Sequence, residues 1–384
     1  MNFTTDISLI KKRIQQIDPV AYGTSRNYLD GSVTYLSPYI SRGVVSTSAI
    51  AKSILSKGYP SHQVIRLIQE LAWRDYYQRV WQQLGDEIFD DIRVSRDSIR
   101  TAKIPTAIIK GDTGIEAIDQ GIQSLYQTGY LHNHLRMYTS SVICNLAKSH
   151  WKQPAQWLYY HLLDGDLASN ALSWQWVAGT FSSKKYYCNQ ENINRYCNTN
   201  QQGTFLDHPY IDLPSLAIPA ILQDTMSLTL TTTLPQKSAP SIDTSCPTLL
   251  YHSYHLDPDW KKDWKANRIL VLEPSHFREF PVSEKVIAFI LELSKQIDGL
   301  QVFVGEVGEL SALIKSNQVY TKEHPAFAHF PGIKEERDWL VPSLQGHFKS
   351  FFDYWKKAEK HLFPDLQKGQ NTNQPIPTTG ALSL

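Results

Sequence analysis

A short polar and aromatic segment, LLDGDLASNALSWQWVAGT, holds residue types that could do chemistry. Asp164 and Asp166 are separated by a single glycine. A carboxylate pair at this spacing fits a metal site, a general acid and base, or simply a helix N-cap. If a helix begins here, Asn170 and Trp174 share one face, where such side chains are core more often than cofactor contacts. The spacing alone leaves these alternatives open.

Five further segments precede this one, and each is weak by itself. In order they are GTSR (23–26), LSPYISRG (36–43), ELAWRDYY (70–77), TG (113–114) and TGYLHNHLRM (128–137). Together they resemble, in the same order, the flavin-binding region of the DNA photolyase/cryptochrome family, whose signature is close to DGD-L-A-x-N followed by W-x-W. The ordered set identifies the chain as a member of that family, and the resemblance implies an FAD held by a helical domain.

The resemblance implies a role for each matching residue. The FAD contacts it implies are Thr24, Ser25, Ser37, Arg136, Asp164, Asp166 and Asn170. The hydroxyl residues would donate to the FAD phosphates, as a turn before a helix can. Arg136 and Asp164 would form a buried ion pair beside the isoalloxazine ring. Asp166 would accept from the ring N–H or the ribose, and Asn170 would face the reactive N5.

An electron relay is also implied by the resemblance. Trp174 matches the tryptophan that passes an electron to the excited flavin, and Trp151 matches the middle member of the relay. The outer, surface tryptophan is missing, since Ser98 stands at its position. Trp157 or a nearby tyrosine is the alternative. Each tryptophan taken alone is equally compatible with a purely structural place in the core.

The family's enzymes for cyclobutane pyrimidine dimers hold the flipped-out lesion in a pocket. The residues matching that pocket are Glu70, Trp73, Asn133, Met137 and Trp176. Helical spacing lets Glu70 and Trp73 point one way, and likewise Asn133 and Met137. Glu70 would hydrogen-bond the pyrimidine edge, while the two tryptophans would form an apolar floor and wall.

The asparagine separates two classes of repair enzyme. Members acting on (6-4) photoproducts have His at the positions of both Asn133 and Met137, and here neither is His. His132 and His134 flank the asparagine, and we interpret them as ordinary polar neighbours. The resemblance therefore favours cyclobutane dimers as substrate.

Two observations weigh against repair. The net charge is only +1, whereas a DNA enzyme needs cations along the phosphates. The candidate DNA contacts are Arg74, Arg79, Lys184 and Lys185, each of which could equally be a solvated surface charge. In addition, Ala171, Leu172 and Ser173 follow Asn170, where the family's repair enzymes usually have small or polar residues.

The positioning elements follow from hydrophobic periodicity. The fold class we expect is mainly α, a photolyase-type helical FAD domain at 1–206, followed by a smaller α/β domain with a parallel sheet at 248–365. Helices are predicted at 62–84, between Thr113 and Gly129, and at 131–151.

The second half changes character. Residues 207–247, rich in Pro, Ser and Thr, read as a connector, and 366–384 as a disordered tail. Short apolar runs alternate with helical patterns from residue 248, which predicts βαβ units. The family normally carries its α/β antenna domain first, and the run at 345–362 resembles the motif that closes that domain. We therefore expect a circular permutation, with an unrelated α/β domain as the alternative.

Composition sets the outer limits. Hydrophobic residues make up 42%, which allows a substantial core, and the four cysteines match no zinc pattern. Without a signal peptide or an apolar run that could span a bilayer, we expect a monomeric cytoplasmic protein. The predicted function is FAD-dependent, blue-light-driven repair of cyclobutane pyrimidine dimers in UV-damaged DNA. The alternative is a cryptochrome-like blue-light sensor, with a structural flavin-binding relic as a third possibility, and any antenna chromophore stays unknown because no glycine-rich phosphate loop marks one.

Overall fold

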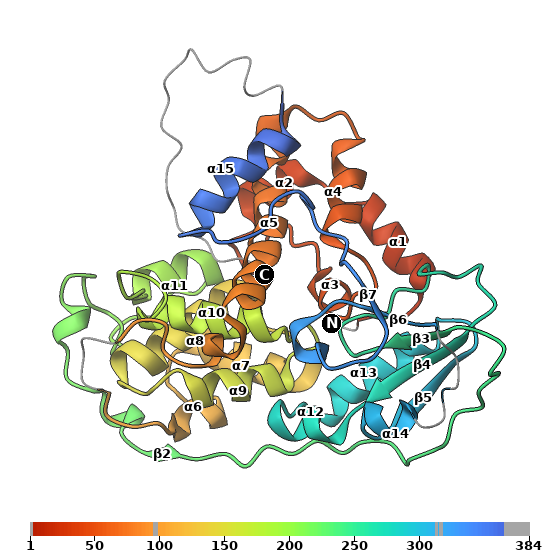
Figure 1. The fold of residues 1–384 in the computed structure, drawn as a ribbon. Helices are drawn as coiled ribbons and strands as arrows, with labels where there is room; N and C mark the ends of the chain where they lie inside the picture. Colours follow the sequence, from red (N-terminus) through yellow and green to blue (C-terminus); the bar gives the residue numbers. More distant parts are fainter. Residues whose placement is uncertain (1–2, 95–98, 312–313, 315–317, 365–384) are drawn as a thin grey trace.

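The structure is a computed structural model, and it describes residues 3–94, 99–311, 314 and 318–364. Ser98 and the tail at 366–384 therefore lie outside the described residues. Within the described ranges, no helix combines the length and apolarity needed to cross a bilayer. The helical part comes first in the chain, and the sheet with its own helices lies beside it (Figure 1).

Eleven α-helices occupy the described part of the first half. They are α1 Ile7–Gln15, α2 Pro19–Ser25, α3 Ser37–Ser41, α4 Thr47–Leu55, α5 Ser61–Leu84, α6 Thr106–Lys110, α7 Glu116–Thr128, α8 Asn133–Ser141, α9 Lys152–His161, α10 Leu167–Ala178 and α11 Gln190–Cys197. The helix predicted at 62–84 is present as α5. The helix predicted to stop at Gly129 is α7, and this glycine ends it at a φ of 71°.

The stretch at 131–151, predicted as one helix, is broken. α8 ends at Ser141 and passes into the π-helical turn η2, Val142–Leu146. Asn145 in this turn is buried, and its side-chain amide donates to the backbone carbonyl oxygens of Val177 and Tyr186 at 3.0 and 2.7 Å. The π turn thus places a polar side chain where it satisfies backbone groups of a neighbouring segment, at the cost of a regular helix.

A five-stranded parallel sheet follows, in the order β5-β4-β3-β6-β7. Its strands are β3 Thr248–Tyr251, β4 Asn267–Leu272, β5 Leu300–Val304, β6 Val319–Lys322 and β7 Ile333–Glu335. Helices α12 Pro274–Glu279 and α13 Glu284–Ser294 connect β4 to β5, and α14 Val307–Ser311 lies between β5 and β6. The predicted alternation is confirmed, although β7 was not expected. Because β4 and β6 lie on opposite sides of β3, the carboxyl ends of β3 and β6 form the topological switch point of the sheet.

The segment at 207–247 runs over the surface and touches both parts (Figure 1). It contains only η3 Leu213–Ser215, η4 Ala220–Leu222 and β2 Thr225–Met226, which pairs antiparallel with β1 Ile104–Pro105 of the helical part. Further along, the Thr232 hydroxyl donates to the Val282 carbonyl oxygen at 2.9 Å, and the Ser241 N–H donates to the Gln301 side chain at 2.7 Å. Hydrogen bonds to both halves therefore hold this long segment.

The last described helix, α15 Phe351–Leu362, does not lie on the sheet, contrary to the expected closing role of 345–362. It packs against α5 of the helical part (Figure 1). The ring of Phe351 stacks on Trp73, with centroids 3.6 Å apart and planes 9° apart. Burial of the helix's apolar face explains this placement, because Phe351, Tyr354 and Trp355 join the hydrophobic core shared by both halves.

Candidate flavin site

A cavity among helices α3, α5, α8, α9 and α10 collects most of the residues expected beside the flavin ring. It encloses about 610 Å³ of space between its walls, open solvent included. The expected residues that line it are Ser37, Asn133, Arg136, Met137, Asp164, Asp166, Asn170 and Trp174. Leu158, Leu162 and Val177 add apolar surface. The mixture of apolar wall and a few convergent polar groups suits a flat cofactor ring.

Asp166 is fixed by three contacts. One of its oxygens accepts the Ser169 backbone N–H at 2.8 Å, which makes Asp166 the N-cap of α10. The other accepts from the Gln78 side chain at 2.7 Å and pairs with Arg74 at 2.9 Å. Of the alternatives left open for this carboxylate pair, the N-cap is the one that the structure shows for Asp166.

Arg136 and Asp164 form a buried ion pair. One guanidinium nitrogen lies 2.7 and 3.0 Å from the two carboxylate oxygens, and the Asp164 side chain is 1% exposed. The Ser37 hydroxyl donates to the same carboxylate at 2.7 Å. In this structure Ser37 therefore orients Asp164. The opposite charges of Arg136 and Asp164 cancel, so the pair adds no net charge to the cavity wall.

The residues present fit a flavin. The Ser169 hydroxyl faces the cavity and is buried without a hydrogen-bond partner among the described residues, so a polar group of a ligand would satisfy it. Gly165 keeps the turn between the two aspartates tight, because a Cβ there would lie 3.1 Å from the carbonyl oxygens of Tyr159 and Leu162. Asn170 lies on the cavity side of α10, and its amide donates to the Ala155 carbonyl oxygen at 2.9 Å.

Thr24 and Ser25 are turned differently from the expectation. Both lie in the last turn of α2, and their hydroxyls donate to backbone carbonyl oxygens of that helix, Ser25 to Ala21 at 2.7 Å. Ser25 also accepts from the Ser32 N–H at 2.9 Å. Neither is among the residues that line the two cavities described here. The neighbouring Arg26, the last residue of the GTSR segment, does line a cavity, although no role was expected for it.

This second cavity adjoins the first, since Ser37 and Asn133 line both. Glu70 lies in it, buried, with an oxygen 3.4 Å from the Arg26 guanidinium. His132 and His134 also line it. Burial, together with the smaller effect of the nearby Arg136 charge, lowers the pKa of His132 to about 4. Burial, together with the smaller effect of neighbouring His132, lowers the pKa of His134 to about 4. Both imidazoles are therefore neutral at pH 7.

The residues expected in the lesion pocket divide among three neighbouring hollows. Asn133 and Met137 line the flavin cavity, with the asparagine nitrogen 3.6 Å from the methionine sulfur. Glu70 lies in the second cavity together with Asn133. Trp73 and Trp176 line a third, open hollow beside α15. The structure thus brings the five residues around one region without joining them in one pocket.

The three tryptophans considered for electron transfer belong to one buried cluster. Trp174 lines the flavin cavity, and Trp151 and Trp157 lie in the same hydrophobic cluster. The Trp151 indole N–H donates to an oxygen of the partly exposed Asp91 at 2.6 Å, so this ring lies next to the surface. The Trp157 N–H instead donates to the Tyr126 hydroxyl at 3.2 Å, inside the protein.

The candidate DNA contacts behave unequally. Arg74 is directed inward to Asp166, and only 11% of its side chain is exposed, so it is not placed to bind phosphate. Arg79 is buried under Trp339, with the guanidinium 3.6 Å from the ring centroid. Lys184 is exposed and Lys185 is half-buried. Pairing across the fold, which the local sequence does not reveal, removes the two arginines from the surface.

Arg42 links the flavin site to the α/β half, a role that the sequence did not predict. The side chain is 1% exposed and donates to the carbonyl oxygens of Leu163 and Gly165 at 3.0 Å each. Its third nitrogen lies 3.4 Å from the Ser253 carbonyl oxygen, just after β3. The only local signal is its place in the LSPYISRG segment, since its partners are far away in sequence.

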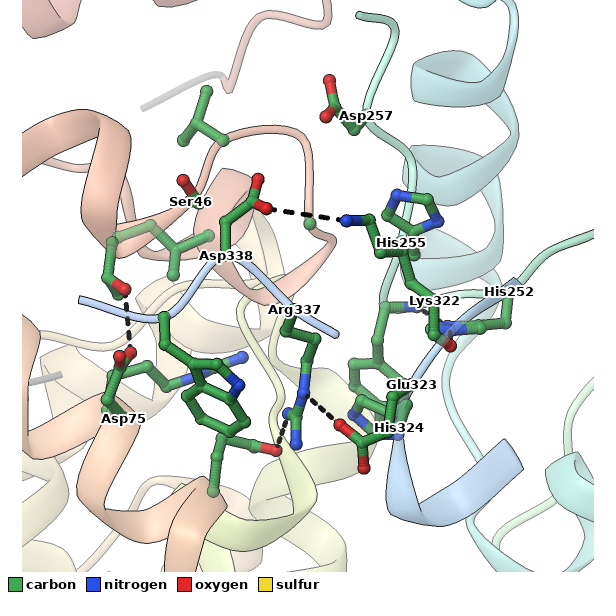
Figure 2. A pocket seen from close by; sticks show the side chains of 18 residues that line it. Ser46, Asp75, His252, His255, Asp257, Lys322, Glu323, His324, Arg337 and Asp338 are labelled. Carbon is green, nitrogen blue, oxygen red and sulfur yellow. Dashed lines mark hydrogen bonds and ion pairs between the residues drawn. The ribbon is translucent and has the colours of Figure 1, made fainter. Parts of the chain in front are cut away.

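A further hollow lies at the switch point of the sheet, against α3, α4 and α5 (Figure 2). Its labelled residues include His252, His255, Asp257, Lys322, Glu323, His324, Arg337 and Asp338. The cations are matched within the protein: Arg337 pairs with Glu323 at 2.9 Å and Lys322 with Asp338 at 3.5 Å. This hollow therefore forms a seam between the two halves in which Arg337 and Lys322 both have carboxylate partners.

A helical domain with an Arg–Asp pair, an Asp N-cap and an Asn on one cavity defines a candidate flavoprotein, and comparisons with known proteins agree. Residues 67–212 match the family model described as the FAD binding domain of DNA photolyase. A deoxyribodipyrimidine photo-lyase of Agrobacterium fabrum is 29% identical over 182 residues, covering 44% of this chain and 37% of the relative. A cryptochrome DASH of Synechocystis is 26% identical over 212 residues, covering 51% and 42%.

Among solved structures, a Synechocystis cryptochrome is similar with a TM-score of 0.47 and 24% identity, covering 58% of this chain and 49% of that one. The chain spans less than half the length of each of these relatives. Residues 67–212 are therefore similar to the FAD binding domain of DNA photolyase, and an α/β domain follows them.

Proposed function

We propose that this chain uses bound FAD and blue light to split cyclobutane pyrimidine dimers in DNA. The observation that carries the proposal is the placement of Asn133 and Met137. Asn133 lies at the wall between the flavin cavity and the cavity of Glu70, and Met137, one turn further along α8 and in contact with it, lies on the flavin side of that wall. Resemblance to the family assigns His at both positions to enzymes for (6-4) photoproducts, so an amide and a thioether favour the cyclobutane dimer.

The side chains around this wall have distinct tasks in the proposal. The bound flavin, when reduced and excited by blue light, would supply the electron that splits the cyclobutane ring and take it back afterwards. Glu70, held by Arg26, offers its carboxyl group to the edge of a pyrimidine. The paired charges of Arg136 and Asp164 keep the surroundings of the ring electrically balanced while its own charge changes.

A blue-light sensor is the second candidate, and one contact favours it. Phe351 covers a face of Trp73 that a repair enzyme would offer to its lesion. In this alternative, Trp174 and Trp151 reduce the flavin under light, and the changed flavin alters the binding of a partner. The pocket residues would then be retained without a substrate.

The test is dimer repair by the purified full-length protein with reduced flavin and a thymine-dimer oligonucleotide. Repair that requires blue light, and that Glu70→Ala slows by about 10- to 150-fold through loss of a charged hydrogen bond, supports the proposal. Glu292→Ala, an exposed carboxylate on α13, serves as the control and should repair normally. No repair with bound, reducible FAD would rule out the enzyme and leave the sensor.

A further inference from the structure

An open trough beside Trp73 and Trp176 plays no part in holding the flavin. It holds about 1430 Å³ of empty space, open solvent included. One wall comes from the second half of α5 and the end of α10, and the other from residues 347–352 at the start of α15. We call the latter the 347–352 segment. A stretch remote in sequence from the FAD motifs thus forms half of a groove at the helical domain.

The lining of the trough is aromatic and cationic. Its rings are Trp73, Tyr76, Trp176, Phe181, Phe348, Phe351 and Phe352. Its cationic and titratable nitrogens come from Arg93, Lys349 and His347, and none of the residues that line it is Asp or Glu. A groove that combines rings for stacking with cations for a backbone is the pattern by which proteins bind single-stranded nucleic acid.

The acidic group nearest in sequence to this wall is already engaged. Asp353, one residue after Phe352, accepts the Lys349 backbone N–H at 3.2 Å and pairs with Lys357 at 3.7 Å. Its charge is therefore partly compensated within α15. Lys349 and Arg93 are both exposed, so their charges face the solvent side of the trough.

Phe351 is a fixed part of the wall and not a removable plug. It is 2% exposed, stacks on Trp73 at 3.6 Å and touches Tyr76 edge-on at 5.8 Å. Removing such a ring from the core costs more than one base gains by stacking, so an incoming base would not displace it. The covered face of Trp73 is consequently closed to substrate.

Phe352 presents the opposite situation. Its side chain is 57% exposed although it is a large apolar ring, and it lies on the trough. A stacked base would cover this ring without moving any part of the core. Lys349 and Arg93 lie in the same lining, where phosphates of the same strand could reach them.

We propose that the trough binds a single strand of DNA, with a base stacked on Phe352 and phosphates on Lys349 and Arg93. The inference rests on the proposed function in one respect, that the strand so held is the one presented to the flavin. The 347–352 segment then supplies strand contacts that Arg74 and Arg79, directed inward, do not.

The test is the affinity of the full-length holoprotein for a fluorescein-labelled oligothymidine, measured by anisotropy in the dark. Phe352→Ala should weaken binding by about 5- to 150-fold, the loss of one base stack, whereas Phe352→Tyr should keep it. Lys349→Ala should weaken binding and reduce the slope of log affinity against log salt by about 0.7. The matched controls are Tyr210→Ala, a ring 48% exposed away from the trough, and Lys295→Ala at the C-cap of α13.

The two proposals can fail separately. Unchanged affinity in Phe352→Ala and Lys349→Ala, or equal losses in the controls, would overturn the trough as a DNA site even if dimers are repaired. Binding that depends on Phe352 and Lys349 in a protein that repairs nothing would support the trough and leave only the repair proposal refuted. Tight binding in the wild type with loss in both variants and normal controls is the expected result.

Discussion

Two ion pairs of nearly equal length have opposite surroundings. Arg136–Asp164 measures 2.7 Å with its side chains 16% and 1% exposed, whereas Lys152–Asp90 measures 2.8 Å with 45% and 79% exposed. A buried charge that loses its partner stays desolvated and uncompensated, while an exposed one returns to water. The same chemical change should therefore have very different effects at the two sites.

The residue-scale prediction compares Asp164→Asn with Asp90→Asn. The first removes the carboxylate charge that compensates the buried Arg136 and should lower the free energy of unfolding by about 3–5 kcal/mol, with loss of bound FAD. The second should change it by less than about 1 kcal/mol and leave flavin content unaltered. Urea denaturation and the flavin absorbance of each purified variant measure both effects. Equal stability of the two variants would show that the pair does not have the surroundings described.

The sequence placed residues correctly where motif and helix agree. Asn133 and Met137, or Asp166 and Asn170, are a turn apart, so helical spacing alone brings them to one side of the cavity. Arg74 could not be placed, because its direction depends on Asp166, on a helix far along the chain. The orientation of Thr24 and Ser25 could not be predicted either, because their hydroxyls donate to backbone carbonyl oxygens of their own helix instead of facing a ligand.

At the scale of elements, the position of α15 differs most clearly from the expected one. Its amphipathic pattern predicts a buried face but not the element that covers it. Two adjacent phenylalanines show which face of the helix is covered: Phe351 is 2% exposed against α5, and Phe352 is 57% exposed. Such long-range docking is not encoded in any local stretch of the sequence.

Truncating each ring tests this docking. Phe351→Ala should lower the free energy of unfolding by about 3–5 kcal/mol because it opens a cavity against Trp73. Phe352→Ala should cost less than about 0.5 kcal/mol, as exposed substitutions do. Thermal or urea unfolding of the two variants gives the comparison. A small effect of Phe351→Ala would mean that α15 is not docked on α5.

At the scale of the whole molecule, the two halves meet through a seam of histidines (Figure 2). Three buried histidines line this seam, His252, His255 and His324, and a fourth, His276, lies behind it with its ring 6.3 Å from that of the lining residue Tyr254. Burial lowers the pKa of His252 and His276 to about 3 each, and those of the other two well below the usual value. His255 is the extreme case, since neither ring nitrogen has a hydrogen-bond partner among the described residues.

These histidines should make stability depend on pH. The unfolded chain binds protons on them near pH 6.5 and the folded chain does not, so the free energy of unfolding falls as pH falls below about 6.5. Each histidine contributes ~1.4 kcal/mol per pH unit until its folded pKa is reached. Burial raises the pKa of Asp257 to about 6 and also raises that of Asp75. Protonation of these two carboxylates in acid favours the folded chain and so opposes the effect of the four histidines.

Urea titrations between pH 7 and pH 4.5 measure this dependence. His255→Phe removes one titrating group and keeps a flat ring against Tyr251, so its stability should fall less steeply with acid than that of the wild type. His62→Phe, an exposed position on α5, should keep the wild-type slope. Identical slopes in all three proteins would exclude His255 as a source of the pH dependence.

The order of the two halves remains our proposal of a circular permutation. A circular permutation requires a parallel sheet in this half, and residues 248–335 form one. Its strand order reverses direction at β3, as in doubly wound α/β folds. The match to the family model ends at residue 212, so the proposed relation of the α/β half to the family's antenna domain is supported only by the topology of its sheet. Hydrophobic alternation predicted this half, because buried parallel strands are encoded as local apolar runs.

The most direct test of light-driven repair is the fluorescence lifetime of the reduced flavin in the full-length protein. Transfer of an electron to a bound dimer competes with emission, so the lifetime should shorten when a thymine-dimer oligonucleotide is added and stay unchanged with the undamaged oligonucleotide. Equal lifetimes with both, at concentrations where both are bound, would contradict the proposed repair of cyclobutane dimers.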